Sequence, residues 1–404
     1  MAMSLSPDEA VHGADRESLW TLFRIVFGFS ALSWSGLALM AQLEHHYVER
    51  DARLSRVAFA DLMALAWMVP GPIGCNVAVQ LGHVLRGRAG AWIAGVASVL
   101  PFFLVMTLLA IFYRTPIVYA AASQTLLHHL EVVLATLIAV TWYKQTRALI
   151  HGAVEWSVAV LGCVTLTYAH DPVAYVLLLG GAFTIGWWAG PPSPVRLKVD
   201  IERIEWLMLA GIVALIVLFS LPLSSTGARA LLWPRLAGAG MTLFGGGFAA
   251  LPVLKSLFVT SAVIVPERDF TLAFALSPLS PGPLLNVVPF LGYLIDGWRG
   301  AVIATLVLFV PSGCLIVLAQ RHVPQLQAHP GFARGMRLLR AMTTAFLAIA
   351  VLKLAHRVPF QPMYLVTALF AGVSFVKLKW PAYVVYGTVA GVYGAWFVYE
   401  TLSL

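Results

Sequence analysis

The sequence predicts an all-α polytopic membrane protein, and three observations lead to this fold class. Hydrophobic residues make up 60% of the 404 residues and charged residues only 11%, a composition unlike that of soluble domains. Uncharged runs of about 20 residues, the length that crosses a hydrocarbon core of roughly 30 Å, recur along the chain. Clusters of glycine and proline recur inside these runs. Because lipid cannot satisfy an open sheet edge, the runs are predicted to be helices.

The net charge and the cysteines exclude several kinds of partner. The formal charge of +8 is typical of short cytoplasmic loops rich in Lys and Arg, so it does not indicate nucleic acid binding. Cys75, Cys163 and Cys314 lie in separate apolar runs without paired spacing. They are interpreted as small packing residues, and neither a disulfide framework, a metal site nor a cofactor is expected.

The first half of the chain is predicted to hold six spans. They follow a short cytosolic N-terminal tail, residues 1–18, which lacks the basic segment and isolated apolar core of a signal peptide. The spans are expected at about 19–43, 57–81, 89–113, 125–143, 154–168 and 172–188. Together they form a first repeat over residues 19–189.

A polar, proline-rich stretch at 190–204 marks the boundary between the halves. The region 190–230 is expected to hold this loop and one connector helix, about 205–223, that has no counterpart in the first half. The second repeat, 231–404, is expected to span the membrane at about 231–258, 270–295, 301–320, 336–354, 360–376 and 381–402. The total is about 13 transmembrane helices.

Breaks inside apolar sequence recur at matching places in the two halves. Pro70-Gly71-Pro72, Gly82, Gly90 and Pro101 correspond to Pro281-Gly282-Pro283, Gly292, Gly300 and Pro311 at a nearly constant offset. A proline inside a helix costs about 3 kcal/mol and a glycine about 1 kcal/mol, so broken helices are expected at both Pro-Gly-Pro sites.

The odd number of helices between the two copies predicts their relative orientation. Six spans and one connector turn the second six-helix repeat upside down, and the excess of Lys and Arg on the alternate loops favours a cytoplasmic N-terminus. If both Pro-Gly-Pro spans were re-entrant hairpins, about 11 crossings would remain and the repeats would be parallel.

Inverted repeats with broken helices are typical of secondary transporters, whose substrates bind where half-helices end. After Pro72 and after Pro283, backbone amides at the start of a new helix lack intrahelical partners and favour an anion. Asn76 and Asn286 can add side-chain donors to these two sites. The alternative is that each motif is only a kink satisfied by neighbouring helices.

Several other residues are candidates for the transport path. Gly245, Gly246 and Gly247 could let the backbone approach a ligand or let helices pack tightly; Ser35 and Gly36 hold the equivalent place in the first half. Asp61 and Glu131 are candidate proton carriers unless they lie at the headgroup level. Arg24, Arg86 and Arg88 could attract anions, although a plain positive-inside loop is the alternative for the last two. His128 and His129 are interpreted as solvated interface residues.

These motifs resemble the chromate ion transporter family, long two-domain type. The resemblance rests on Phe244-Gly245-Gly246-Gly247, Leu251-Pro252, Glu267-Arg268-Asp269-Phe270, both Pro-Gly-Pro motifs, Gly297-Trp298-Arg299-Gly300-Ala301 and Phe309-Val310-Pro311-Ser312. It implies homologous halves of opposite orientation and export of chromate, with sulfate as a competing analogue and chromate resistance as the outcome. The chain departs from the family pattern at Trp34-Ser35-Gly36-Leu37 and Cys75-Asn76, which leaves the substrate open between chromate, sulfate and another anion.

The predicted function is therefore secondary-active transport of a tetrahedral oxyanion across the inner (plasma) membrane. No P-loop, H-E-x-x-H or G-x-S-x-G motif occurs, so an enzyme is not predicted. A non-transporting sensor or subunit is the alternative function. The expected partners are the anion and membrane lipid, with a second copy of the chain as the candidate protein partner.

Overall fold

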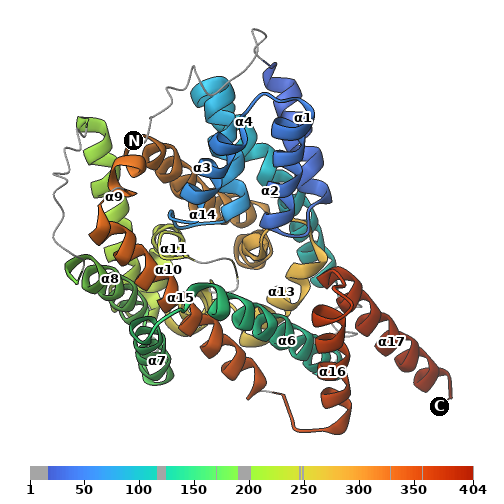
Figure 1. The fold of residues 1–404 in the computed structure, drawn as a ribbon. Coiled ribbons are helices and arrows are strands. Elements are labelled where there is room, and N and C mark those ends of the chain that lie inside the picture. The colour runs from blue at the N-terminus through green and yellow to red at the C-terminus, as the bar shows by residue number, and fades with distance from the viewer. Residues whose placement is uncertain are drawn as a thin grey trace.

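A computed structural model describes residues 17–115, 124–169, 171–189, 202–244, 247, 250–327, 329–356 and 358–403. Every regular element formed by these residues is a helix (Figure 1). The helices before the connector are α1 (Leu19–Leu32), α2 (Gly36–Glu44), the π-helical η1 (His45–Arg50), α3 (Arg56–Ala66), α4 (Ile73–Tyr113), α6 (Gln124–Leu149), α7 (Ala153–Tyr168) and α8 (Pro172–Trp188).

The helices of the connector and of the second half come next along the chain. They contain α9 (Arg203–Ser220), α10 (Ser225–Ala230), α11 (Leu232–Gly240), α12 (Ala250–Lys255), the π-helical η3 (Ser256–Ser261), α13 (Glu267–Leu276), the short 3-10 turns η4 (Ser277–Leu279) and η5 (Leu284–Asn286), α14 (Val287–Gln327), α15 (Pro330–Ala355), α16 (Pro362–Val376) and α17 (Ala382–Ser403).

The predicted first span, 19–43, is not one continuous helix. α1 ends at Leu32, and α2 starts after Ser35, whose side chain accepts a hydrogen bond from the amide of Ala38 at 3.1 Å. Serine is a strong N-cap residue because its oxygen satisfies an orphan amide. The Ser-Trp-Ser sequence therefore ends one helix and starts another, which the apolar run did not reveal.

α1 and α2 form a hairpin, because the chain after α2 returns to the start of α1. The Tyr47 hydroxyl lies 3.4 Å from a carboxylate oxygen of Glu17, and the Arg53 guanidinium lies 3.7 Å from the other. Burial raises the pKa of Glu17, and the Arg53 charge opposes this rise. The backbone carbonyl of Glu17 also accepts a 2.9 Å hydrogen bond from Arg86.

α3 and the first part of α4 form a second hairpin with Pro70-Gly71-Pro72 at its tip. α4 itself turns back at Arg86 and Gly87, where Gly87 has a φ of 62°. The turn brings Gly82 against Gly90, so that a Cβ on Gly82 would lie 2.3 Å from the Gly90 carbonyl oxygen. In a straight helix these two residues would be about 12 Å apart. α4 is therefore a first limb, 73–85, and an antiparallel second limb, 88–113.

The second half repeats these local features. α14 turns back at Asp296 and Gly297, where Gly297 has a φ of 54°, and Gly292 packs on Gly300 as Gly82 packs on Gly90. Each half also has a six-residue π-helix. Shortly after it comes a non-glycine residue with a φ of 49°, Ala52 in one half and Val263 in the other.

The hairpins of the two halves open toward opposite ends of the second limb of α4. At the start of this limb, Arg86 contacts Glu17, where the first-half hairpins open. At its end, the Tyr113 hydroxyl donates a 2.7 Å hydrogen bond to Asp269, and Arg114 donates one to the carbonyl of Leu294. The limb rises about 39 Å between these two ends, and the hairpin tips lie between them.

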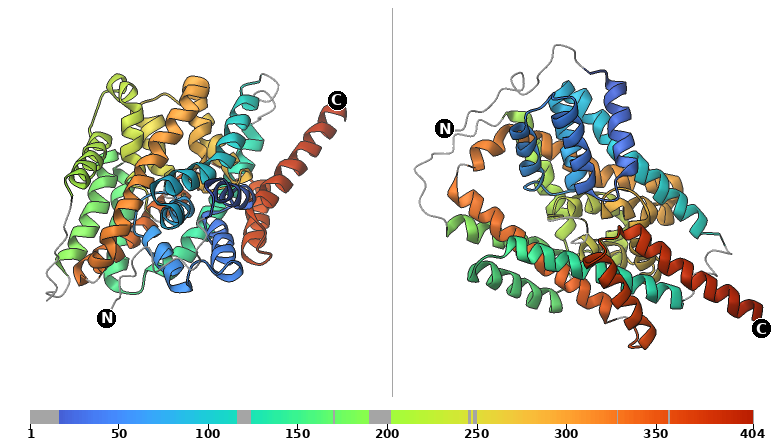
Figure 2. Two further views of the ribbon diagram at one scale, coloured as in Figure 1. Left: turned by 90° about the horizontal axis from the view of Figure 1, so that it is seen from above. Right: turned by 45° about the vertical axis from the view of Figure 1, so that its right-hand side comes forward.

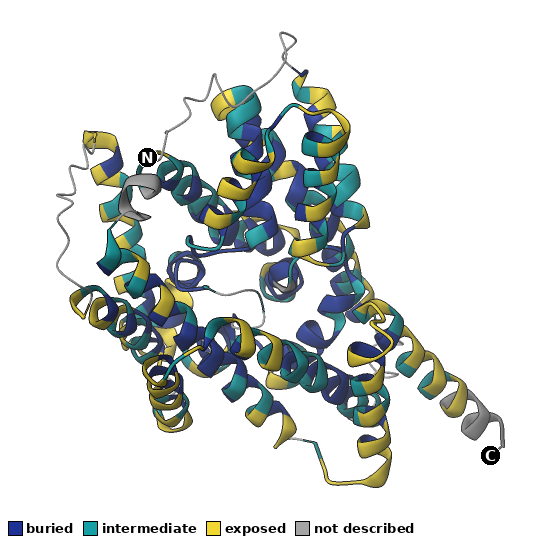
Figure 3. Cartoon of the chain, viewed as in Figure 1, coloured by how far each residue is buried: buried dark blue, intermediate teal, exposed yellow. Residues whose placement is uncertain are grey.

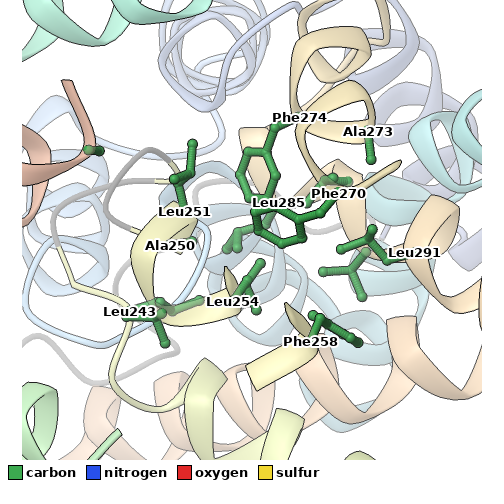
Figure 4. Close-up of a cluster of buried hydrophobic side chains, with 14 of the residues drawn as sticks. Leu243, Ala250, Leu251, Leu254, Phe258, Phe270, Ala273, Phe274, Leu285 and Leu291 are labelled. Carbon is green, nitrogen blue, oxygen red and sulfur yellow. The ribbon is translucent and has the colours of Figure 1, made fainter. Parts of the chain in front are cut away.

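The remaining helices pack around this centre. α15 lies against α6, α7 and α8, while α17 extends away from the rest of the chain (Figures 1 and 2). Buried residues concentrate on the central helices, among them α11, α13 and α14, and exposed residues lie on the outer helices (Figure 3). Many of the exposed residues are large and apolar. Leu251, Leu254, Phe258, Phe270 and Phe274 form part of the central hydrophobic cluster (Figure 4).

Five of the described helices are long and apolar enough to cross a membrane: Ile73–Tyr113, Thr125–Leu149, Arg203–Ser220, Val287–His322 and Pro330–Ala355. Shorter apolar helices include Ala153–Tyr168, Pro172–Trp188 and Pro362–Val376. The all-helical architecture confirms the predicted class, whereas the thirteen crossings stay a prediction.

Candidate functional site

The chain turns between α1 and α2, α3 and α4, α11 and α12, and α13 and α14 form four hairpin tips, which meet in the middle of the molecule through a reciprocal pair of backbone hydrogen bonds. The Gly71 amide donates to the carbonyl oxygen of Leu243 at 2.8 Å, and the Gly282 amide donates to the carbonyl oxygen of Ser33 at 2.7 Å. Each Pro-Gly-Pro tip is thus bonded to a turn of the other half: Gly71 to the turn after α11, and Gly282 to the turn after α1. This contact links residues that are far apart in the sequence.

Both central glycines are required by their backbone conformation and by their neighbours. Gly71 has a φ of 118° and Gly282 a φ of 100°, which L-residues rarely adopt. A Cβ on Gly71 would lie 1.9 Å from the Oγ of Ser312, and one on Gly282 would lie 2.7 Å from the Phe102 ring. We call Pro70-Gly71-Pro72 the first tip and Pro281-Gly282-Pro283 the second tip. The neighbour of the first tip is therefore polar, and the neighbour of the second tip is aromatic.

Asn76 and Ser312 form a polar contact between the halves at the first tip. The Ser312 hydroxyl lies 2.7 Å from the carbonyl oxygen of Pro70 and 3.0 Å from the Asn76 Oδ1. The Asn76 Nδ2 makes one long hydrogen bond, 3.4 Å, to the same carbonyl. An amide nitrogen carries two protons, so Asn76 retains donor capacity. Ser312, on the second limb of α14, was not predicted as a site residue.

Asn286 has a different environment from Asn76. Its Nδ2 donates at 2.9 Å to both the Ser277 carbonyl and the Ser280 hydroxyl, and its Oδ1 accepts from the Ser277 hydroxyl. The amide is therefore saturated by its own hairpin. This geometry suits a residue that stabilises the second tip.

Two helix N-termini converge beside the first tip. Gly36 starts α2 and packs on Gly74 in the first turn of α4, where a Cβ on Gly36 would lie 3.0 Å from the Gly74 amide nitrogen. Among the described residues, no side chain caps the start of α4, whose N-cap residue is Pro72. Next to α2, the Ser33 hydroxyl and the Trp34 indole nitrogen are buried and make no hydrogen bond within the described chain. The Trp34 ring lies against Tyr383 of α17 and the Ser33 carbonyl accepts from Gly282, so the donors that the structure brings to the first tip are the backbone amides at the start of α4 and the Asn76 side chain.

A cavity of about 700 Å³ reaches this tip from one end of the molecule, and we call it the vestibule. It lies between α4, α9 and the second limb of α14, and apolar side chains form most of its wall. Its described polar and small lining residues at the tip are Pro72, Cys75 and Asn76, and those toward its mouth are His83, Arg88, Glu202, Glu205 and Arg321.

The arginines near the vestibule mouth differ in their partners. Arg321 lies 2.6 Å from Glu202 and 3.1 Å from Glu205, and Arg86 donates to Glu17. Arg88 is exposed, lines the vestibule and makes no hydrogen bond or ion pair within the described chain. Of the predicted anion-attracting residues, Arg88 is the one that the structure brings to the cavity.

The other predicted charged residues lie away from the vestibule. Arg24 and Asp61 are exposed on α1 and α3. Glu131 is 8% exposed on α6, and its Oε2 lies 3.2 Å from the His128 Nδ1. His129 Nδ1 lies 2.8 Å from the Thr367 hydroxyl. The two histidines, expected as solvated residues, therefore pack within a partly buried polar cluster between α6 and α16.

The glycine run is only partly described. Gly245 and Gly246 lie outside the described residues, and Gly247 has a 3-10 helical backbone conformation. In α11, Arg235 is 1% exposed and donates to the carbonyls of Phe219 and Leu221 at the end of α9. Arg235 holds the place that Arg24 holds in the first half, but the sequence did not single it out.

Comparisons with known proteins extend these observations. The family profile described as chromate transporter matches residues 20–187 and again residues 230–395. The chain is 26% identical over 398 residues to a chromate transport protein of Cupriavidus metallidurans, covering 95% of each chain. It is 24% identical over 393 residues to a probable chromate transport protein of Synechococcus elongatus, covering 95% of this chain and 98% of the relative.

A chromate transport protein of Pseudomonas aeruginosa is 25% identical over 315 residues, covering 72% of this chain and 70% of the relative. No solved structure matches the chain significantly. The two profile matches cover both halves and omit most of the connector region. The chain belongs to the chromate transporter family.

Proposed function

We propose that this protein is a secondary-active carrier that exports a tetrahedral oxyanion, with chromate as the physiological substrate and sulfate as its analogue. The observation that carries the proposal is the first Pro-Gly-Pro tip at the inner end of the vestibule, where Pro72 and Asn76 line the cavity. The names of the relatives support chromate as the substrate.

The tip suits a dianion because its donors are neutral and fixed. The uncapped amides at the start of α4 and the spare Asn76 proton can replace water around an oxyanion, while the Ser312 hydroxyl holds the Pro70 carbonyl and the Asn76 Oδ1 in place. Burial of several full positive charges is avoided, which keeps the anion exchangeable. Arg88 raises the local anion concentration at the mouth without entering the tip.

The proposed membrane layout has four re-entrant hairpins, with their tips meeting near the midplane. The crossings are then the second limbs of α4 and α14 together with α6, α7, α8, α9, α15, α16 and α17. This layout has nine crossings and replaces the thirteen expected from the sequence. The opposite opening of the hairpins in the two halves supports an inverted repeat. With a cytoplasmic N-terminus in the inner membrane, the vestibule opens to the cytoplasm and is the route by which chromate enters for export.

We assign proton coupling to Glu131 with His128 beside it. Glu131 is buried on a helix long and apolar enough to cross the membrane, and a buried carboxylate close to an imidazole can take up and pass on a proton. Asp61, the other candidate proton carrier, is exposed on α3, which favours the alternative that it lies at the headgroup level.

Flux through purified protein in proteoliposomes tests the proposal. Chromate uptake into vesicles, competed by sulfate, is expected under an imposed pH gradient, and Asn76→Ala should reduce it at least tenfold. Ser157→Ala is the matched control, because Ser157 is an exposed polar residue on α7 and donates only to its own helix.

The outcomes separate the alternatives. Sulfate flux without chromate flux would keep the carrier mechanism and change the substrate. A folded protein that moves neither ion under any gradient would overturn the carrier proposal and favour the sensor or subunit function.

A further inference from the structure

A pair of aromatic rings separates the second tip from the vestibule. Phe309, on the second limb of α14, lines the vestibule. The Phe102 ring packs on it, with 5.3 Å between the ring centroids, and is fully buried. A Cβ on Gly282 would lie 2.7 Å from the Phe102 ring. The two rings therefore fill the space between the vestibule wall and the second tip.

Phe102 holds the place in the first half that Ser312 holds in the second half. Each directly follows the proline inside a second limb. Each also contacts the Pro-Gly-Pro tip of the other half, because Phe102 packs on Gly282 and Ser312 donates to the Pro70 carbonyl. Pro72 of the first tip lines the vestibule, whereas no described residue of the second tip does. The vestibule therefore reaches the tip with the polar neighbour and stops at the aromatic one.

Buried polar groups without partners lie around the second tip. The Gly282 amide donates to the Ser33 carbonyl, but the Ser33 hydroxyl and the neighbouring Trp34 Nε1 are buried and make no hydrogen bond within the described chain. The Trp34 ring packs on Tyr383 of α17, with 4.4 Å between the ring centroids. The Tyr386 hydroxyl, about one turn farther along α17, is also buried without a described partner. α17 packs in turn on η4, which leads into the second tip.

These three groups suit a ligand that accepts several hydrogen bonds. An indole N–H can only donate, and a hydroxyl can donate as well as accept. Buried polar groups that lack partners are rare in folded proteins, and they indicate a bound molecule or a second conformation that satisfies them. The donors at the second tip are neutral, as are those at the first tip, so they can replace water around an anion without holding it tightly.

We infer that the second tip is a closed binding station for a small oxyanion, which Phe102 and Phe309 separate from the vestibule. The inference rests on the proposed function, in which the anion passes from the first tip to the second when the two rings move apart. The rings keep the second station closed while the first is open to the vestibule. Alternating access requires such a barrier between the two sides.

Modification of a cysteine at the second tip tests the barrier without any transport. The three native cysteines are replaced by Ser, Ser33→Cys is introduced, and the full-length protein in detergent is treated with a thiol reagent that carries a sulfonate group. Phe102→Ala is expected to speed modification at position 33 by about tenfold or more. Phe309→Ala should do the same, which keeps the test valid if Phe102→Ala does not fold. Phe103→Ala is the control, because Phe103 also lines the vestibule but packs on Trp298.

Sulfate then distinguishes an anion station from a space that holds only water. In the Phe102→Ala protein, sulfate at constant ionic strength is expected to slow the modification. Tyr386→Phe should weaken this protection about tenfold, whereas Tyr168→Phe, at the exposed end of α7, should leave it unchanged. Protection that persists with Asn76→Ala, even without flux, separates the second tip from the vestibule site.

Two results would overturn the inference, whether or not the protein transports chromate. Equal modification at position 33 with and without the Phe102 ring would show that the ring is not a barrier. Modification that is faster after Phe102→Ala but that sulfate does not slow would show that the second tip is not an anion station.

Discussion

The Gly71 amide is bonded to the Leu243 carbonyl oxygen across the two halves of the chain, at 2.8 Å. The matching bond joins Gly282 to Ser33. A movement of one half relative to the other must therefore carry both tips with it. In the proposed carrier mechanism, a rocking motion of the two halves would have to move or break these two bonds.

Gly71→Ala is expected to destabilise the protein by about 3 kcal/mol or more, because a Cβ would collide with Ser312 and the backbone would stay at a φ that alanine rarely adopts. Thermal unfolding in detergent measures the loss, and chromate flux should be lost with it. Gly180→Ala is the control, since no atom lies within 4 Å of the added Cβ. An unchanged Tm for Gly71→Ala would contradict this prediction, because it would mean that the tip accommodates the added Cβ without a loss of stability.

Asn286→Ala is expected mainly to lower stability, whereas Asn76→Ala is expected mainly to impair transport. Removal of the saturated Asn286 amide should lower the free energy of unfolding by about 1 to 3 kcal/mol, so Tm should fall clearly. Asn76→Ala should change Tm little but raise the KM for chromate. Paired measurements of Tm and flux check this, and a larger Tm loss for Asn76→Ala would reverse the assigned roles.

Arg88→Gln is expected to slow chromate uptake by raising KM severalfold, and the effect should fade at high ionic strength, because an exposed charge acts through a screened field. Arg86→Gln removes a bond to the Glu17 carbonyl instead. It should lower Tm without the same salt dependence. Flux measured over a range of salt concentrations decides between these effects.

Sulfate is expected to protect Cys314 from maleimide modification, because Cys314 and Cys75 line the vestibule while Cys163 does not. The measurement uses a variant in which Cys75 and Cys163 are replaced by Ser. A second variant, which keeps Cys163 and has Ser at the other two positions, is the control. Protection of Cys163 without protection of Cys314 would contradict the prediction and indicate that the anion does not pass through the vestibule.

Glu17 and Glu49 are expected to give opposite pH dependences. Burial raises the Glu17 pKa, so the folded state holds its proton more tightly and stability falls as pH rises from 4.5 through the raised value. A hydrogen bond from His45 lowers the Glu49 pKa, so stability falls as pH drops from 4.5 through the lowered value. Thermal unfolding against pH should lose the first trend in Glu17→Gln and the second in Glu49→Gln.

The sequence by itself determined the all-helical class and the places where helices break. Glycine with positive φ and proline without an N–H act through their own backbone, so Pro70-Gly71-Pro72 and Pro281-Gly282-Pro283 could be located without any tertiary contact. The family resemblance followed from the same motifs. The break at Ser33 to Ser35 was missed because serine is compatible with a helix interior as well as with a cap.

Only the tertiary structure decided which of the two tips lines the vestibule. Asn76 and Asn286 hold equivalent places in the sequence, but Asn76 faces Ser312 and the vestibule, whereas Asn286 is saturated by Ser277 and Ser280. The partners come from segments far apart in the chain, and their positions depend on how whole helices pack. Local propensity carries no information about such contacts. Two asparagines at equivalent places in the sequence therefore have different partners in the folded protein.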